Sequence, residues 1–95
     1  MAVGFLFEAP GMTQEQYDQL MRGLNLAEAG AEWPQGLISH AAGPMEGGWR
    51  VIDIWESEEL ARHFFQSRLE AVFQRLGVRP PPPKQFAIHN LHVSR

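Results

Sequence analysis

The segment from His40 to Ser57 indicates more about the fold than any other part of this chain. It predicts the end of one strand, a two-residue turn at Glu46-Gly47, a second strand over Trp49–Trp55, and a helix that begins after Ser57. Gly47 suits the turn because glycine readily adopts the positive φ of a tight hairpin. Side chains alternate along a strand, so one face of the second strand carries Trp49, Val51, Asp53 and Trp55.

Further strands and helices are predicted on both sides of this hairpin. The apolar run Val3–Phe7 predicts a first strand, and Thr13–Gln16 has the sequence of a capping box that opens a helix. Gly36–Gly43 predicts the strand before the turn, and Lys84–Val93 predicts a last strand after a run of prolines. Apolar residues recur at helical spacing in two places: Tyr17, Leu20, Met21 and Leu24, and then Leu60, Phe64, Phe65, Leu69, Val72, Phe73 and Leu76.

The elements follow one another as strand, helix, strand, strand, helix, strand. In a chain of 95 residues this order predicts a single domain over residues 1–95 with an α+β fold, the ferredoxin-like split βαβ plait. Its four-stranded antiparallel sheet would carry both helices on one face. We expect the other face to carry Val51, Trp55 and Leu91, and we expect a second copy of the chain to cover it in a homodimer.

The composition argues against several classes of partner. The chain has 8 Lys and Arg residues against 11 acidic ones, and its arginines are scattered, so nucleic acid is not an expected partner. It has no cysteine, which excludes disulfides and thiolate chemistry and suits a reducing compartment. No apolar run reaches the length of a membrane span, and the first residues lack the pattern of a signal peptide. These features predict a cytoplasmic protein without a membrane partner.

Counting back from the turn places His40 opposite Asp53. Cross-strand neighbours have Cβ atoms about 4.5–5.5 Å apart, so the imidazole and the carboxylate can meet. An aspartate that holds one imidazole nitrogen leaves the other free as a general base, which makes His40 and Asp53 candidate catalytic residues. A loop longer or shorter by one residue would put them on opposite faces. In the structural alternative, the two side chains only satisfy each other's hydrogen bonds.

Other side chains are candidates for binding a ligand. Trp33, Trp49 and Trp55 can form an aromatic wall for a flat molecule, with the Tyr17 hydroxyl at its rim and His89 joining His40 in the same cavity. Two histidines and Asp53 would make a possible metal triad, but no close histidine spacing supports it. We therefore predict a small apolar or aromatic ligand, with no metal and no organic cofactor.

Several segments resemble one known family. They are Glu8–Tyr17, Pro34–His40, Gly47–Ser57 and Ile88–Asn90. They are similar to small, largely uncharacterised antibiotic-biosynthesis-monooxygenase-like (ABM-like) proteins of the dimeric α+β barrel superfamily. The resemblance implies that two subunits pair their sheets face to face around ligand cavities. It also implies activities that range from cofactor-independent oxygenation of phenolic polyketides to haem breakdown, or no activity.

The resemblance extends only in part to the functional residues of that family. Its oxygenases and haem-degrading members use an Asn on the first strand and a Trp near the third strand, and the haem enzymes add a His on the second helix. Trp55 and His63 match two of these positions, whereas Val3–Phe7 contains no Asn. Two hypotheses follow: a cofactor-independent enzyme on a small aromatic or polyketide-type substrate, with His40 as base and Asp53 orienting it, or a non-catalytic dimeric module that binds a small ligand or has a structural role.

Overall fold

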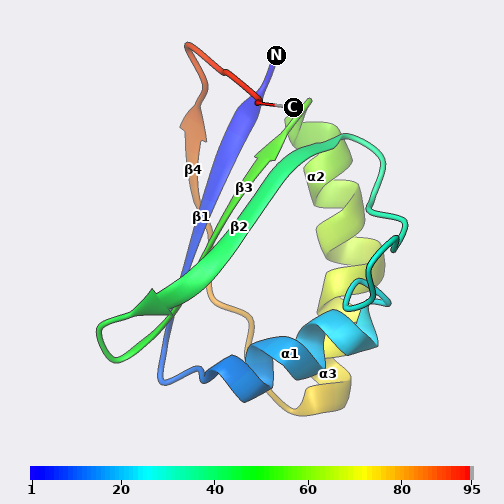
Figure 1. The fold of residues 1–95 in the computed structure, drawn as a ribbon, viewed down its shortest axis with the longest axis vertical. Coiled ribbons are helices and arrows are strands. Elements are labelled where there is room, and N and C mark those ends of the chain that lie inside the picture. Colours follow the sequence, from blue (N-terminus) through cyan, green and yellow to red (C-terminus); the bar gives the residue numbers. More distant parts are fainter. Residues whose placement is uncertain (95) are drawn as a thin grey trace.

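The computed structural model describes residues 1–94 and shows a sheet with its helices gathered on one side (Figure 1). The elements are β1 (Val3–Pro10), α1 (Gln14–Gly23), β2 (Leu37–Met45), β3 (Gly48–Trp55), α2 (Glu58–Phe64), η1 (Phe65–Leu69), α3 (Glu70–Leu76) and β4 (Lys84–Ala87). The described part of the chain forms a four-stranded sheet in the order β2-β3-β1-β4, with every neighbouring pair antiparallel. This topology confirms the predicted ferredoxin-like α+β plait.

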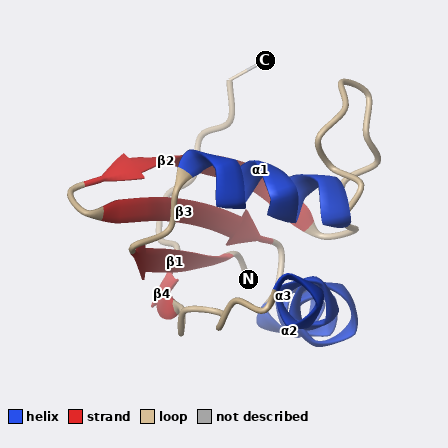
Figure 2. Ribbon diagram, turned by 90° about the horizontal axis from the view of Figure 1, so that it is seen from below, coloured by secondary structure: helices blue, strands red, loops and turns tan. Residues whose placement is uncertain are grey.

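The helical layer has two parts (Figure 2). The helix α1 packs over β2 and β3, where Tyr17 contacts the rings of His40 and Trp49. The continuous helical stretch of α2, η1 and α3 packs on β1 and β3, where Phe65 contacts the Phe5 ring. Among the residues described, no helix is both long and apolar enough to cross a membrane.

The hairpin forms with the predicted turn. Met45 pairs with Gly48 across Glu46-Gly47, and Gly47 has a φ of 74°, in the region that favours glycine. This register pairs His40 with Asp53, as the residue count from the turn predicts. The same alternation turns both side chains toward the helices.

A bulge interrupts β2 near its start. Three positions separate Leu37 from His40 on β2, whereas only two separate their partners Trp55 and Asp53 on β3. The additional residue in β2 lets Leu37 and His40 face the helices together, which strict alternation would forbid. The bulge therefore enlarges the apolar surface beside His40.

The helix α1 begins with the predicted capping box. The Gln16 backbone N–H donates to the Thr13 hydroxyl at 3.1 Å, and the Thr13 N–H donates to the Gln16 side chain at 3.0 Å. At its other end, Arg68 donates to the Leu24 carbonyl at 2.7 Å, so a side chain of the second helical stretch satisfies an orphan acceptor. Both ends of α1 are thus fixed, which holds its inward face over the sheet.

The second helical stretch contains a π turn that the apolar pattern did not predict. Ser57 caps it, and Gly77 ends it in the left-handed conformation with φ 69°. Between them, η1 has π-helical bonding, in which the Glu70 N–H donates to the Phe65 carbonyl. Apolar spacing does not reveal one widened turn, because inward residues recur at nearly the same interval on either side of it.

Two predicted details of the second half of the chain are wrong. Leu76, expected on the buried face, is 37% exposed in the last helical turn. The last strand ends at Ala87 rather than Val93, because Ala87 pairs with Val3 and β1 begins there. Beyond this pair the Ile88 N–H still donates to the Ala2 carbonyl at 3.4 Å, and the described residues after Ile88, up to Ser94, form no strand.

The prediction of which residues lie on the open face of the sheet is also wrong. Val51 and Trp55 face the helices, and Leu91 lies beyond the end of β4. The sheet registers place other apolar side chains on the uncovered face: Leu6, Ile52, Ile54 and Phe86. Phe86 lies against Gly4, where a Cβ would collide with the ring, so a larger residue at this position would require the Phe86 ring to shift. The open face is apolar as expected, but it is built from the opposite set of residues.

The core lies between the sheet and the helices. Phe5 and Trp55 are fully buried at 0% exposure. Phe65 packs edge-to-face on Phe5, Phe7 and Trp55, with ring centroids 5.2, 5.5 and 5.9 Å away. Such contacts add about 0.5–1.5 kcal/mol each to the free energy gained by burial.

Alanine in place of Phe73 should lower the free energy of unfolding by about 3–5 kcal/mol, because its ring is only 5% exposed. Phe65→Ala should have a similar effect through the loss of its three ring contacts. Leu76→Ala is the matched control on the same helical stretch and should cost much less. Urea unfolding measures all three, and parent-like stability of both phenylalanine variants would contradict this packing.

Candidate functional site

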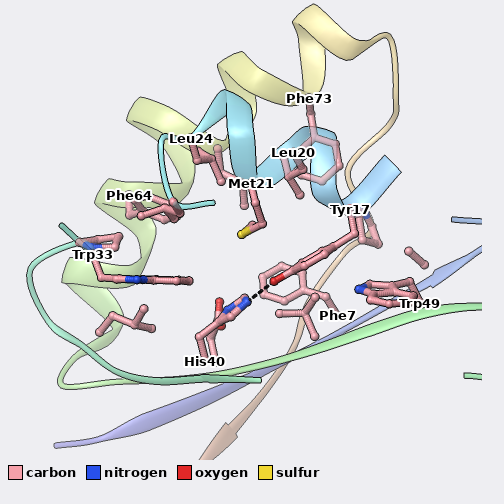
Figure 3. A pocket seen from close by; sticks show the side chains of 18 of the residues that line it. Phe7, Tyr17, Leu20, Met21, Leu24, Trp33, His40, Trp49, Phe64 and Phe73 are labelled. Carbon is pink, nitrogen blue, oxygen red and sulfur yellow. Dashed lines mark hydrogen bonds and ion pairs between the residues drawn. The ribbon is translucent and has the colours of Figure 1, made fainter. Parts of the chain in front are cut away.

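Three side chains from three elements form a continuous hydrogen-bonded chain. The Tyr17 hydroxyl on α1 lies 2.6 Å from His40 Nε2 on β2, and His40 Nδ1 lies 2.6 Å from Asp53 Oδ1 on β3. Figure 3 shows the first of these bonds as a dashed line between the helix and the sheet. The predicted contact between His40 and Asp53 is confirmed, and Tyr17 extends it into a triad.

The proton positions in the triad depend on the ionisation of its groups. An ionised Asp53 only accepts, so it takes a proton from His40 Nδ1. The other nitrogen of a neutral imidazole accepts from the Tyr17 hydroxyl, whereas that of an imidazolium donates to it. The expectation of a free imidazole nitrogen is therefore wrong, because Tyr17 already occupies it.

Burial shapes the electrostatics of this triad. The side chains of His40 and Asp53 are 16% and 11% exposed. Burial raises the pKa of Tyr17 to about 12, and the nearby negative charges of Asp53 and Asp18 add to the effect. Tyr17 is therefore a neutral phenol over the physiological pH range.

An apolar cavity of about 60 Å³ adjoins the triad. Figure 3 shows how residues of the sheet and of both helical parts surround it. Side chains from every layer of the fold line it, including Phe7, Met12, Tyr17, Leu20, Met21, Leu24, Trp33, Leu37, His40, Trp49, Val51, Asp53, Trp55, Phe64, Leu69 and Phe73. Asp53 is the only acidic member, and no lysine or arginine of the described chain belongs to the lining. The triad thus presents its polar atoms to an otherwise apolar space.

Trp33 stands between this cavity and the surface. Its ring centroid lies 5.1 Å from that of His40, yet the residue is 40% exposed. It also lines a surface groove of about 450 Å³ together with Tyr17 and His40. The same three side chains border both spaces, so an outward movement of the Trp33 ring would join the cavity to the groove.

Trp49 and Trp55 line the cavity as predicted, but His89 does not. His89 is exposed beyond the end of β4, because the strand that was expected to carry it inward stops at Ala87. His63 is also exposed, on the outer side of α2. Over residues 1–94, no group of three or more His, Asp or Glu side chains is arranged to hold a metal ion.

Sequence reasoning missed the role of Tyr17. It was expected at the rim, but its hydroxyl is hydrogen-bonded directly to His40. Its place as the first inward residue after the capping box was the available signal. Trp33, in the loop between α1 and β2, lines the cavity together with Trp49 and Trp55, as the predicted aromatic wall requires.

No protein-family model matches this sequence, and no curated protein matches it. A solved structure from structural genomics, described as protein YJCS, is similar with a TM-score of 0.59. The match covers 94% of this chain and 100% of that chain at 16% sequence identity. At this identity the similarity shows the shared α+β fold.

Tyr17 is the only tyrosine of the chain, so the ultraviolet absorbance of tyrosinate reports its ionisation alone. The folded protein should titrate with a midpoint of about 12, against 10.0 for an unperturbed tyrosine. Between these values the unfolded state binds fewer protons, so the free energy of unfolding should fall as pH rises. Asp53→Asn should lower the midpoint only in part, because burial is the larger cause.

The control for this titration is Glu28→Gln, a change on the exposed loop that should leave the midpoint where it is. A midpoint near that of free tyrosine in the folded parent protein would show that Tyr17 is not held as the structure describes.

Proposed function

We propose that this protein is a small enzyme that removes a proton from an aromatic or polyketide-type substrate without an organic cofactor. The observation that carries the proposal is the Tyr17–His40–Asp53 triad beside an apolar cavity. Buried polar groups that face an apolar, ligand-sized or expandable space are a common form of active site.

The triad supports a simple proton relay. A substrate hydroxyl or acidic C–H against Tyr17 Oη gives its proton to that oxygen while Tyr17 passes its own proton to His40 Nε2. Asp53 then stabilises the imidazolium through the Nδ1–H bond. Tyr17 never has to carry a full negative charge in this scheme, which fits the raised pKa of its phenol.

The ABM-like resemblance supports a cofactor-independent enzyme, but the functional residues of that family differ from the residues of the proposed relay. Members of that family that form quinones or degrade haem use an Asn, a Trp and, for haem, a His. In this chain Trp55 is fully buried against Phe64 and Phe65, and His63 is exposed on α2. Tyr17, His40 and Asp53 take the place of that set in the proposed mechanism.

Substrate entry requires the Trp33 ring to move. The cavity, at about 60 Å³, is smaller than the ~150 Å³ that accommodates benzene in an engineered apolar cavity. Joining it to the adjoining groove would provide the space. Return of the Trp33 ring toward His40 would then exclude water from the proton relay.

The alternative is a non-catalytic module that binds a small apolar ligand. The observation that favours it is the occupied Nε2 of His40, because a histidine bonded on both nitrogens is already satisfied. In that case the triad fixes α1 to the sheet and shapes the cavity, and no proton moves.

A panel of naphthols and anthrones separates the two functions. Binding is followed by ligand-observed NMR. Turnover is followed by oxygen uptake and product absorbance, because dissolved O2 oxidises the deprotonated anthrone to an anthraquinone and is itself reduced to water. With a substrate that reacts, Tyr17→Phe should lower kcat about 10²-fold or more while binding changes little, because it removes only the hydroxyl of the relay. Gln19→Ala, on the exposed side of α1, is the matched control and should retain the parent rate.

Parent-like turnover in Tyr17→Phe would contradict the relay. Binding without turnover across the panel would favour the ligand-binding module.

We also propose that the chain forms a homodimer through the open face of the sheet. Ile52 and Phe86 are 40% and 44% exposed there, among other apolar side chains of the face. Glu8 on the same face is already paired with Arg50 at 3.3 Å and Lys84 at 3.0 Å, so its charge opposes association little. Exposed apolar surface costs about 25 cal/mol per Å², which a second copy would recover.

Sedimentation at micromolar concentration should give about twice the 10.8 kDa mass of the chain. Ile52→Asp should give a folded monomer, because it places a charge in the centre of the open face, whereas Gln19→Ala should remain dimeric. A parent protein that sediments as a monomer would contradict the proposal.

A further inference from the structure

Two buried donors in the cavity lining lack a hydrogen-bond partner. Within residues 1–94, the indole nitrogens of Trp49 and Trp55 are the buried side-chain nitrogen or oxygen atoms without one. Both residues line the cavity beside the triad. An indole N–H only donates, and leaving a buried donor unpaired costs about 1–3 kcal/mol. An acceptor that enters the cavity would recover this free energy.

The two indoles differ in their surroundings. Trp55 lies in the core, 5.6 Å from the Phe64 ring and 5.9 Å from the Phe65 ring. Trp49 lies at the other end of the same strand face, about 20 Å away along β3 at the usual rise of a strand. Its ring is 5.4 Å from that of Tyr17, so it stands next to the proton-relay triad. Trp49 is therefore the donor placed to contact a molecule on which the triad acts.

No protein acceptor bonds to the Trp49 indole nitrogen within the described residues. Its neighbours there are the apolar side chains of Phe7, Ala9 and Met12, with Ala9 directly opposite Trp49 in the sheet. Figure 3 shows the Trp49 ring facing the interior beside Tyr17 and Phe7. An oxygen acceptor for this indole has to come from a ligand or from water.

The charge of the lining further restricts the chemical class of the ligand. Asp53 is its acidic residue, and the described lining contains no lysine or arginine to pair with an anion. A carboxylate or phosphate buried here would lose its hydration without gaining a cationic partner, and the negative charge of Asp53 would repel it. A ketone, quinone or ester oxygen accepts a hydrogen bond without carrying a charge.

We infer that the Trp49 indole N–H recognises a carbonyl oxygen, and that the ligand of this cavity is an uncharged, largely apolar carbonyl compound. This inference rests on the proposed small-molecule site and names the class of molecule that the site takes. The carbonyl oxygen lies at Trp49, and the apolar body extends along the cavity toward the Tyr17 hydroxyl.

The test uses three one-ring probes that differ at a single group: acetophenone, ethylbenzene and benzoate. The indole N–H signals of the ¹⁵N-labelled parent protein are assigned with Trp33→Phe and Trp49→Phe. Acetophenone should move the Trp49 indole proton downfield, as an oxygen acceptor does, and leave that of Trp55 in place. Ethylbenzene should bind more weakly and produce no such downfield shift, and benzoate should not bind.

Trp49→Phe keeps a ring at this position and removes the N–H. It should weaken acetophenone binding about three- to tenfold, the usual worth of one hydrogen bond, and leave ethylbenzene binding unchanged. Gln19→Ala, on the exposed side of α1 and outside the lining, is the control and should bind both probes as the parent does.

The outcomes separate this inference from the proposed site. Equal binding of acetophenone and ethylbenzene, an unmoved or upfield-shifted Trp49 signal, or benzoate binding as tight as that of acetophenone would overturn the carbonyl assignment and leave the small-molecule site in place. If none of the three probes shifts the methyl signals of Leu20, Met21 or Val51, the small-molecule site fails and the inference fails with it.

Discussion

The register between β2 and β3 is the constraint on which the site depends. The Glu46-Gly47 turn sets it, and the period of two along each strand carries it to His40 and Asp53. A slip of one residue would turn one of them to the open face and leave the other buried without its partner. The backbone pairing of the two strands thus places the carboxylate and the imidazole in contact.

The helical layer completes what the sheet begins. The capping box fixes the start of α1, and the bond from Arg68 fixes its end. The position of the helix in turn places the Tyr17 hydroxyl within hydrogen-bond distance of His40. The resulting triad ties helix to sheet at the place where the two layers leave an apolar cavity between them.

Features that depend on residues close together in the sequence could be predicted. The hairpin and the two helix caps follow from a glycine turn, a capping box and Ser57, and the contact of His40 with Asp53 follows from a residue count. The bond from Tyr17 depends on how a helix packs across two strands, which no short pattern encodes. The early end of β4 depends on where β1 begins, and the wrong position of His89 follows from that.

The bulge in β2 has a consequence for how this scaffold can diversify. The hairpin turn sets the register of His40, and the bulge absorbs an extra residue on the far side of that pair. Changes of length before His40, in the bulge or in the loop that carries Trp33, can therefore accumulate without displacing the polar pair. Descendants of such a chain can vary the loop that carries Trp33 while keeping the hydrogen-bonded pair of His40 and Asp53, so the fold separates a segment that can change in length from one that must stay fixed.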